Sequence, residues 1–127
     1  MLIISVLKNV IVVYFQHLFK RSLTSVDIQN MKGEQIQTLH PQAGKKNKRI
    51  SLEKYLIIKE NILSILNEDQ LTHTELMERL YENINDIFEG GVQWYGETVK
   101  LDLEARGIVE RTGSKPAKYR LLKDIQE

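Results

Sequence analysis

The chain has 127 residues, of which 42% are hydrophobic and 28% charged, and its net charge is +1. These values are typical of one soluble globular domain that buries its own core, and they exclude a disordered tail. The absence of cysteine excludes disulfides and thiolate sites, and the three histidines are too far apart in the sequence to predict a metal site.

Residues 1–30 form an apolar extension that differs from the rest of the chain. The apolar run over residues 2–15 contains Lys8 and is shorter than the about 20 residues that a membrane-spanning helix needs. Further basic residues follow this run instead of preceding it, unlike those of a secretory signal. Three interpretations stay open: a translation artefact upstream of a start at Met31, a helix that packs on the domain or pairs two chains, and a membrane anchor.

The next segment predicts a β-hairpin. Residues 35–39 alternate between polar and apolar side chains, which favours a short strand. Residues 40–44 contain proline and glycine and are typical of a turn. The basic residues 45–50 either return as the second strand or form a solvated loop.

Residues 51–70 carry the signals of a helix with defined ends. Ser51 is a typical N-cap residue, and the acidic Glu53 suits the positive end of a helix. The polar residues 67–70 end the pattern. One wide buried face is formed by Leu52, Tyr55, Leu56, Ile58, Ile62, Leu63, Ile65 and Leu66.

A second helix is predicted after Thr72. Thr72 and Glu75 have the spacing of a capping box, in which each side chain bonds a backbone N–H of the first turn. His73 lies in this turn, and we expect it to face solvent or cap the helix rather than bind a ligand. The side chains expected to point inward are Leu76, Met77, Leu80 and Tyr81.

A third helix and two further strands complete the prediction. The helix covers residues 92–106, and Gly107 is expected to end it with a positive φ. Residues 108–111 and 118–122 predict two strands, joined by a hairpin loop over residues 112–117.

This order of elements resembles that of a winged helix-turn-helix domain. Residues 99–111 (VKLDLEARGIVER) are similar to the end of the recognition helix and the first wing strand of that superfamily. A closer resemblance covers about residues 36–122 and is to a family of short, uncharacterised bacterial winged-helix proteins. The residues that carry it are Pro41, Gly44, Lys54, Tyr55, Trp94, Tyr95 and the block from Val99 to Ala105.

The resemblance implies an α+β fold with three helices, a C-terminal two-stranded wing and a short N-terminal hairpin. We accordingly divide the chain into the extension, a winged-helix domain over residues 31–123 and a tail over residues 124–127. The resemblance implies no activity, because none is established for that family.

The third helix is the candidate reader of nucleic-acid bases. Tyr95, Val99 and Leu103 lie four residues apart and are expected to face the core, flanked by Trp94, Leu101 and Ala105. The outward positions are then Gln93, Gly96, Glu97, Lys100 and Glu104. Gln93 and Lys100 are the candidate contacts to bases or phosphates. The acids Glu97, Asp102 and Glu104 repel phosphate and weaken this interpretation.

Basic residues outside the helices give a stronger signal. Residues 31–50 carry a net charge of +4, whereas residues 51–90 carry −6. Phosphate contacts dominate non-specific affinity for DNA, so loops of this kind can bind even where the helix reads little. Solvated loops that balance the acidic helices are the alternative. The candidate contacts are Arg111, Lys115, Lys118 and Arg120 in the wing, and Lys45, Lys46, Lys48 and Arg49 in the first hairpin.

The sequence predicts a protein that is not an enzyme. It has no phosphate-binding glycine-rich loop, no nucleophile elbow and no metal-ligand spacing, so no catalytic, cofactor or metal residue is assigned. The expected function is a cytoplasmic, transcription-associated DNA-binding module. The alternative is a module that binds a protein partner or a second copy, through the acidic first two helices or the region of Trp94. No membrane or small-molecule ligand is expected.

Trp94 itself either covers the seam between the second and third helices or stacks on a base.

Overall fold

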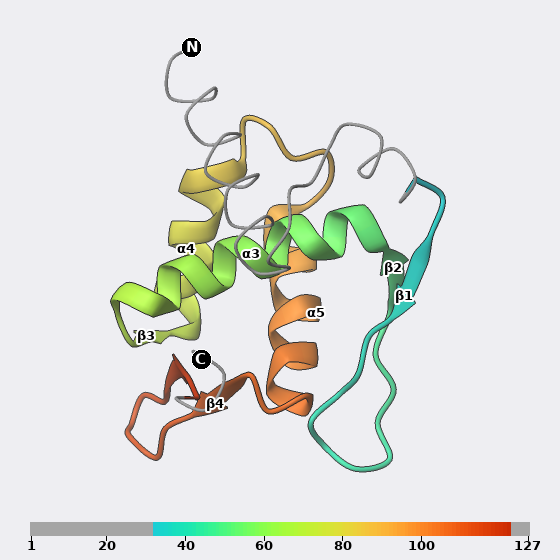
Figure 1. Ribbon diagram of the computed structural model, residues 1–127. Coiled ribbons are helices and arrows are strands. Elements are labelled where there is room, and N and C mark those ends of the chain that lie inside the picture. Colours follow the sequence, from blue (N-terminus) through green and yellow to red (C-terminus); the bar gives the residue numbers. More distant parts are fainter. Residues whose placement is uncertain (1–31, 123–127) are drawn as a thin grey trace.

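The computed structural model describes residues 32–122, so the expectations for residues 1–30 and 124–127 lie outside it. This part of the chain has the predicted α+β class, with three helices and two small antiparallel sheets (Figure 1). The elements in chain order are β1 (Gln35–Gln37), β2 (Arg49–Ser51), α3 (Leu52–Glu68), β3 (Leu71–Thr72), α4 (His73–Ile84), α5 (Val92–Ala105), β4 (Val109–Arg111) and β5 (Lys118–Leu121). Among residues 32–122, no helix has the length and apolar run needed to cross a membrane.

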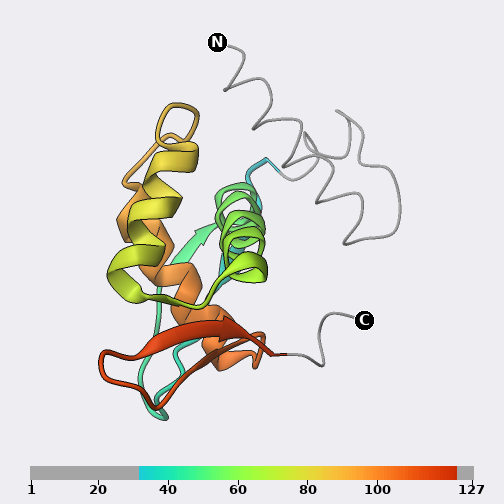
Figure 2. The same ribbon diagram turned by 90° about the vertical axis from the view of Figure 1, so that its left-hand side faces the viewer.

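The two sheets lie at different places around the helices. β1 and β2 form the predicted hairpin, in which Ile36 is opposite Ile50. The second sheet has the order β3-β5-β4 and lies across one end of the helices (Figure 2). β3 is absent from the sequence prediction because two residues are too short to show an alternating pattern. The connectivity and sheet order are compatible with a winged-helix-like arrangement.

The core lies where α3 packs on α4 and α5. The apolar face predicted for α3 is buried at Ile58 and Ile62, and the other helices contribute Leu80 and Leu103, all with no exposed surface. The prediction for Tyr81 is wrong, because this side chain is 46% exposed. The buried stripe of α4 runs through Leu76, Leu80 and Ile84, and Tyr81 lies 100° further round the helix, on the solvent side.

The helix ends follow the predicted local signals. The Ser51 side chain accepts a hydrogen bond from the backbone N–H of Lys54, and Thr72 and Glu75 form the capping box. Gly107 has a φ of 75° and follows α5. Its N–H bonds the Glu104 carbonyl, and the N–H of Ile108 bonds the Leu103 carbonyl. These two bonds define a Schellman motif, which requires the left-handed residue that glycine supplies.

Candidate nucleic-acid interface

The eight basic loop residues occur as two patches at the same end of the molecule. Lys45, Lys46, Lys48 and Arg49, the 45–49 patch, belong to the β1–β2 hairpin, and Arg111, Lys115, Lys118 and Arg120, the 111–120 patch, belong to the β4–β5 hairpin. Both hairpins extend beside the C-terminal end of α5 (Figures 1 and 2). All eight residues are exposed. The residues are accessible on the two hairpins, while their contact with nucleic acid stays a prediction.

Two of these cations have partners among the described residues. Arg120 Nε lies 2.5 Å from Glu110 Oε2, and Arg49 Nε donates a hydrogen bond of 3.0 Å to Gln35 Oε1. Within residues 32–122, the other six side chains form no ion pair or side-chain hydrogen bond. Six unpaired charges remain available to an anionic partner.

The prediction that Lys100 points outward is wrong. Lys100 is 4% exposed, and its Nζ lies 3.9 Å from the centre of the Tyr119 ring and 3.3 Å from Glu104 Oε2. Glu104 was also expected to point outward, but its side chain is only 13% exposed. The cause is strand β5, which covers this side of α5 with Tyr119. Lys100 is therefore not a candidate contact to bases or phosphates.

Gly96 was also expected to face outward and is buried instead. A Cβ built on Gly96 would lie 2.8 Å from both Leu80 Cδ2 and Met77 Sδ of α4. Glycine therefore allows α4 to approach α5 closely at this position. Together with the cover by β5, this contact leaves only a narrow exposed stripe on α5, which contains Gln93, Trp94 and Glu97.

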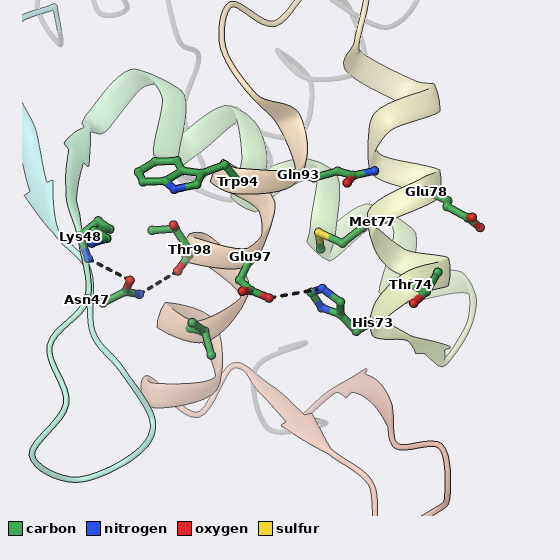
Figure 3. Close-up of a pocket in the computed structure, with 11 residues that line it drawn as sticks. Asn47, Lys48, His73, Thr74, Met77, Glu78, Gln93, Trp94, Glu97 and Thr98 are labelled. Carbon is green, nitrogen blue, oxygen red and sulfur yellow. Dashed lines mark hydrogen bonds and ion pairs between the residues drawn. The ribbon is translucent and has the colours of Figure 1, made fainter.

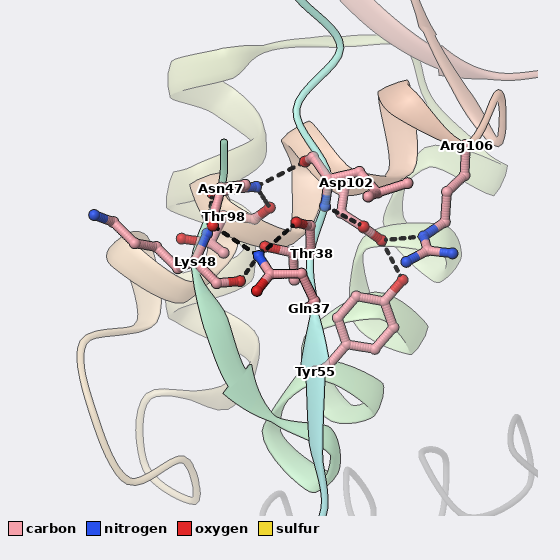
Figure 4. A network of polar contacts seen from close by, with 9 residues as sticks. Gln37, Thr38, Asn47, Lys48, Tyr55, Thr98, Asp102 and Arg106 are labelled. Atoms are coloured by element: carbon pink, nitrogen blue, oxygen red, sulfur yellow. Dashed lines mark hydrogen bonds and ion pairs between the residues drawn. The ribbon is translucent and has the colours of Figure 1, made fainter. Parts of the chain in front are cut away.

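Asp102 faces the interior and cannot repel phosphate as predicted (Figure 4). Its carboxylate has no exposed surface and accepts hydrogen bonds from the Leu39 N–H at 2.8 Å, from Arg106 Nε at 2.8 Å and from the Tyr55 hydroxyl. Burial and the bond to Asp102 raise the pKa of Tyr55. This carboxylate joins α3, α5 and the β1–β2 loop, because each donor belongs to one of them.

Asn47 attaches the same loop to α5 a second time. Its side-chain amide donates to the Leu39 carbonyl at 2.8 Å and to the Thr98 carbonyl at 3.0 Å, while Thr98 itself is buried in α5 (Figure 4). The buried Thr38 hydroxyl donates to the Lys48 carbonyl across the loop. These contacts fix the 45–49 patch relative to α5. Sequence reasoning missed them, and the only signal was the presence of amide and hydroxyl side chains beside a turn.

A groove of about 580 Å³ follows the exposed stripe of α5 (Figure 3). α5 forms its floor, α4 forms one wall, and the β1–β2 loop forms the other wall. His73 Nε2 lies 3.3 Å from Glu97 Oε1, so the half-buried His73 contacts α5 instead of only facing solvent. Burial, followed by the charge of Lys100, lowers the pKa of His73. The lowered pKa favours the neutral form of His73.

Trp94 is 50% exposed and contributes to this groove. Its ring packs edge-on against the ring of Tyr95, with 4.9 Å between the ring centres. The indole points toward the β1–β2 hairpin and away from α4 (Figure 3). The expectation that Trp94 covers the seam between the second and third helices is therefore wrong, and the ring is accessible.

Comparisons with known proteins identify a family. A search of curated proteins and a search of solved structures found no match. A family of unknown function, DUF6958, matches residues 35–119, which is most of the part of the chain that the structure describes. The match covers the Asp102 contacts, the groove and every residue of the two basic patches except Arg120. The chain therefore belongs to the DUF6958 family.

Proposed function

We propose that this domain is a non-catalytic winged-helix module that binds duplex DNA, in association with transcription, chiefly through its phosphates. The observation that carries the proposal is the set of six unpaired, exposed cations on the two hairpins beside α5. The sheet order β3-β5-β4 supports the winged-helix interpretation, with the loop over residues 112–117 as the wing. Phosphate contacts supply most of the non-specific affinity for DNA.

Helix α5 contributes little to this binding. Its exposed stripe carries no cation, and Glu97 would repel an approaching phosphate. Gln93 is the one side chain of the stripe suited to reading a base edge, since an amide can pair with adenine. The walls on both sides of α5 also keep the helix from entering a major groove deeply. We therefore propose broad rather than sequence-specific recognition.

The test measures binding to duplex DNA over a salt series. Each phosphate contact contributes about 0.9 to the slope of log affinity against log salt concentration. Replacing Arg111, Lys115 and Lys118 together by alanine should therefore reduce the slope by about 2.7 and weaken binding to all sequences. Arg120→Ala should have a smaller effect than Lys118→Ala, because Glu110 already neutralises Arg120.

Two controls make the DNA test specific. Lys59→Ala removes one positive charge from α3, outside both patches, and should leave the slope unchanged. Glu97→Gln should strengthen non-specific binding if α5 lies against the DNA. A triple variant that binds like the wild type, or a wild type that does not bind at low salt, would exclude this function.

A protein-interaction module is the second candidate, and the groove over α5 favours it. Its floor contains an exposed tryptophan, which is a side chain enriched at the energetic centres of protein interfaces. Of the eight basic residues only Lys48 lines this groove, so an acidic protein at the same salt concentration tests the two patches and not the groove. If the basic patches bind only as general anion sites, the acidic protein should compete with DNA at equal charge.

A further inference from the structure

The groove over α5 contains the most exposed large apolar side chain of the described residues. Within residues 32–122, Leu39, Tyr81 and Trp94 are the exposed large apolar side chains, at 43%, 46% and 50%. Trp94 lines the groove, whereas Leu39 and Tyr81 lie outside its lining. An exposed tryptophan in a concave surface is typical of protein-binding sites.

The centre of this groove is negatively charged. Glu97 lies one helical turn from Trp94 on the floor, and its side chain is 58% exposed. His73 contacts this carboxylate, and burial lowers the pKa of His73, which favours the neutral imidazole. More than half of the Glu97 side chain is open to solvent, so its carboxylate can pair with a further cation. Glu78 adds a second exposed carboxylate at the outer rim of the α4 wall (Figure 3).

Trp94 and Glu97 lie one turn apart on α5, with the indole directed toward the β1–β2 hairpin and the carboxylate directed toward His73 on α4 (Figure 3). The carboxylate can pair with an arginine or lysine side chain, and the indole can pack on an apolar side chain or on the plane of a guanidinium. The aliphatic part of either basic side chain can cover the apolar surface of Met77 and Leu101. Phosphate groups are disfavoured here, because both groove carboxylates on α4 and α5 repel them.

We infer that the groove between α4 and the β1–β2 loop binds a basic segment of a partner protein, with an arginine or lysine side chain paired with Glu97 and a neighbouring apolar side chain packed on Trp94. The exposed Lys48 on the opposite wall orients the segment, because a basic side chain is repelled there and attracted on the α4 side. This inference rests on the second candidate function, and it does not require that the two basic patches bind DNA.

The probe is a displayed library of random peptides, selected on the full chain and again on the Trp94→Ala variant. Peptides that bind only the wild type should be enriched in arginine or lysine next to an apolar residue. Trp94 is the single tryptophan of the chain, so binding of an enriched peptide should change the tryptophan fluorescence of the protein. Enrichment of acidic peptides, or enrichment that is the same on Trp94→Ala, would overturn the inference.

Matched variants test the two groups that receive the segment. With a fluorescently labelled peptide, Trp94→Ala should weaken binding about 30-fold, as at the centre of a protein interface. Glu97→Gln should weaken it about two- to fivefold, the range of an exposed ion pair. Glu82→Gln removes an exposed carboxylate of α4 outside the groove lining and should leave affinity unchanged. Equal effects of Glu97→Gln and Glu82→Gln would contradict the inference. Each variant is compared only where its urea midpoint equals that of the wild type.

The same fluorescence signal separates this inference from DNA binding. The triple variant at Arg111, Lys115 and Lys118 should lose affinity for duplex DNA but keep the peptide, since these residues lie outside the groove lining. If duplex DNA displaces the peptide, quenches Trp94 and binds more tightly to Glu97→Gln, the groove belongs to nucleic acid and the inference is wrong. Loss of DNA binding alone leaves the peptide result intact.

Discussion

Asp102→Asn is expected to destabilise the domain more than any other single polar substitution in its neighbourhood. The Asp102 carboxylate has no exposed surface and accepts hydrogen bonds from Leu39, Tyr55 and Arg106. Asparagine preserves the volume but removes the charge and turns an amide N–H₂ toward these donors. Each hydrogen bond to a charged group contributes about 1.5–3 kcal/mol, and the substitution weakens three of them, so we expect a total cost of about 3–5 kcal/mol. This cost is a large part of the about 5–15 kcal/mol by which small domains are stable.

Substitutions at the partners of Asp102 should each cost less stability than Asp102→Asn. Tyr55→Phe removes one hydrogen bond to a charged group, which costs about 1.5–3 kcal/mol, and Asp102 then keeps its other two donors. Arg106→Leu should cost less, because the Arg106 side chain is 36% exposed and water can replace it. In the Asp102→Asn background, Tyr55→Phe should cost less than in the wild type, because the hydroxyl has already lost its acceptor.

Urea unfolding with a double-mutant cycle measures these differences. Amide hydrogen exchange at Leu39 should also accelerate in Asp102→Asn, because the N–H of Leu39 loses its partner. Asp86→Asn, an exposed substitution between α4 and α5, serves as the matched control and should leave the midpoint unchanged. An Asp102→Asn variant as stable as this control, or a larger loss for Tyr55→Phe than for Asp102→Asn, would refute the reasoning.

Three further predictions concern single positions. Glu60 is 2% exposed, and burial raises its pKa to about 7, so the folded state binds a proton that the unfolded state has released. Stability should therefore fall by up to about 3 kcal/mol as pH rises from about 4.5 to about 7. Glu60→Gln should remove this fall, and identical urea-midpoint profiles against pH would contradict the assignment. Gly107→Val should cost about 1 kcal/mol or more in urea, because the Gly107 φ of 75° strains a branched residue. Gly107→Asn should recover part of that loss, and an unchanged midpoint for Gly107→Val would mean that no strain is present. Replacing Lys100 by methionine together with Glu104 by glutamine should leave affinity for duplex DNA unchanged, because Lys100 Nζ is buried against Tyr119. A loss of DNA affinity in this charge-neutral double variant would show that Lys100 reaches the DNA.

Signals that act over a few residues were correctly interpreted from the sequence. The Ser51 cap, the capping box at Thr72 and the left-handed Gly107 each depend on bonds to backbone groups within five residues. The eight basic residues of the two hairpins are exposed for a similar reason, because cations on a hairpin face water unless another element covers them. The α+β class follows from the helical and alternating patterns, whose ends these signals mark.

Only the tertiary structure decided which side chains of α5 are buried and which are exposed. The sequence predicts one buried stripe through Val99 and Leu103, but α4 covers Gly96, β5 covers Lys100, and the β1–β2 loop covers Asp102. The residues that make these contacts are distant in the sequence: Asp102 bonds groups 47 and 63 residues away. Helical periodicity predicts which side chains share one buried face. It does not predict how many other helices, strands and loops pack around that helix. The groove exists for the same reason, because its floor and its two walls meet only after the chain has folded.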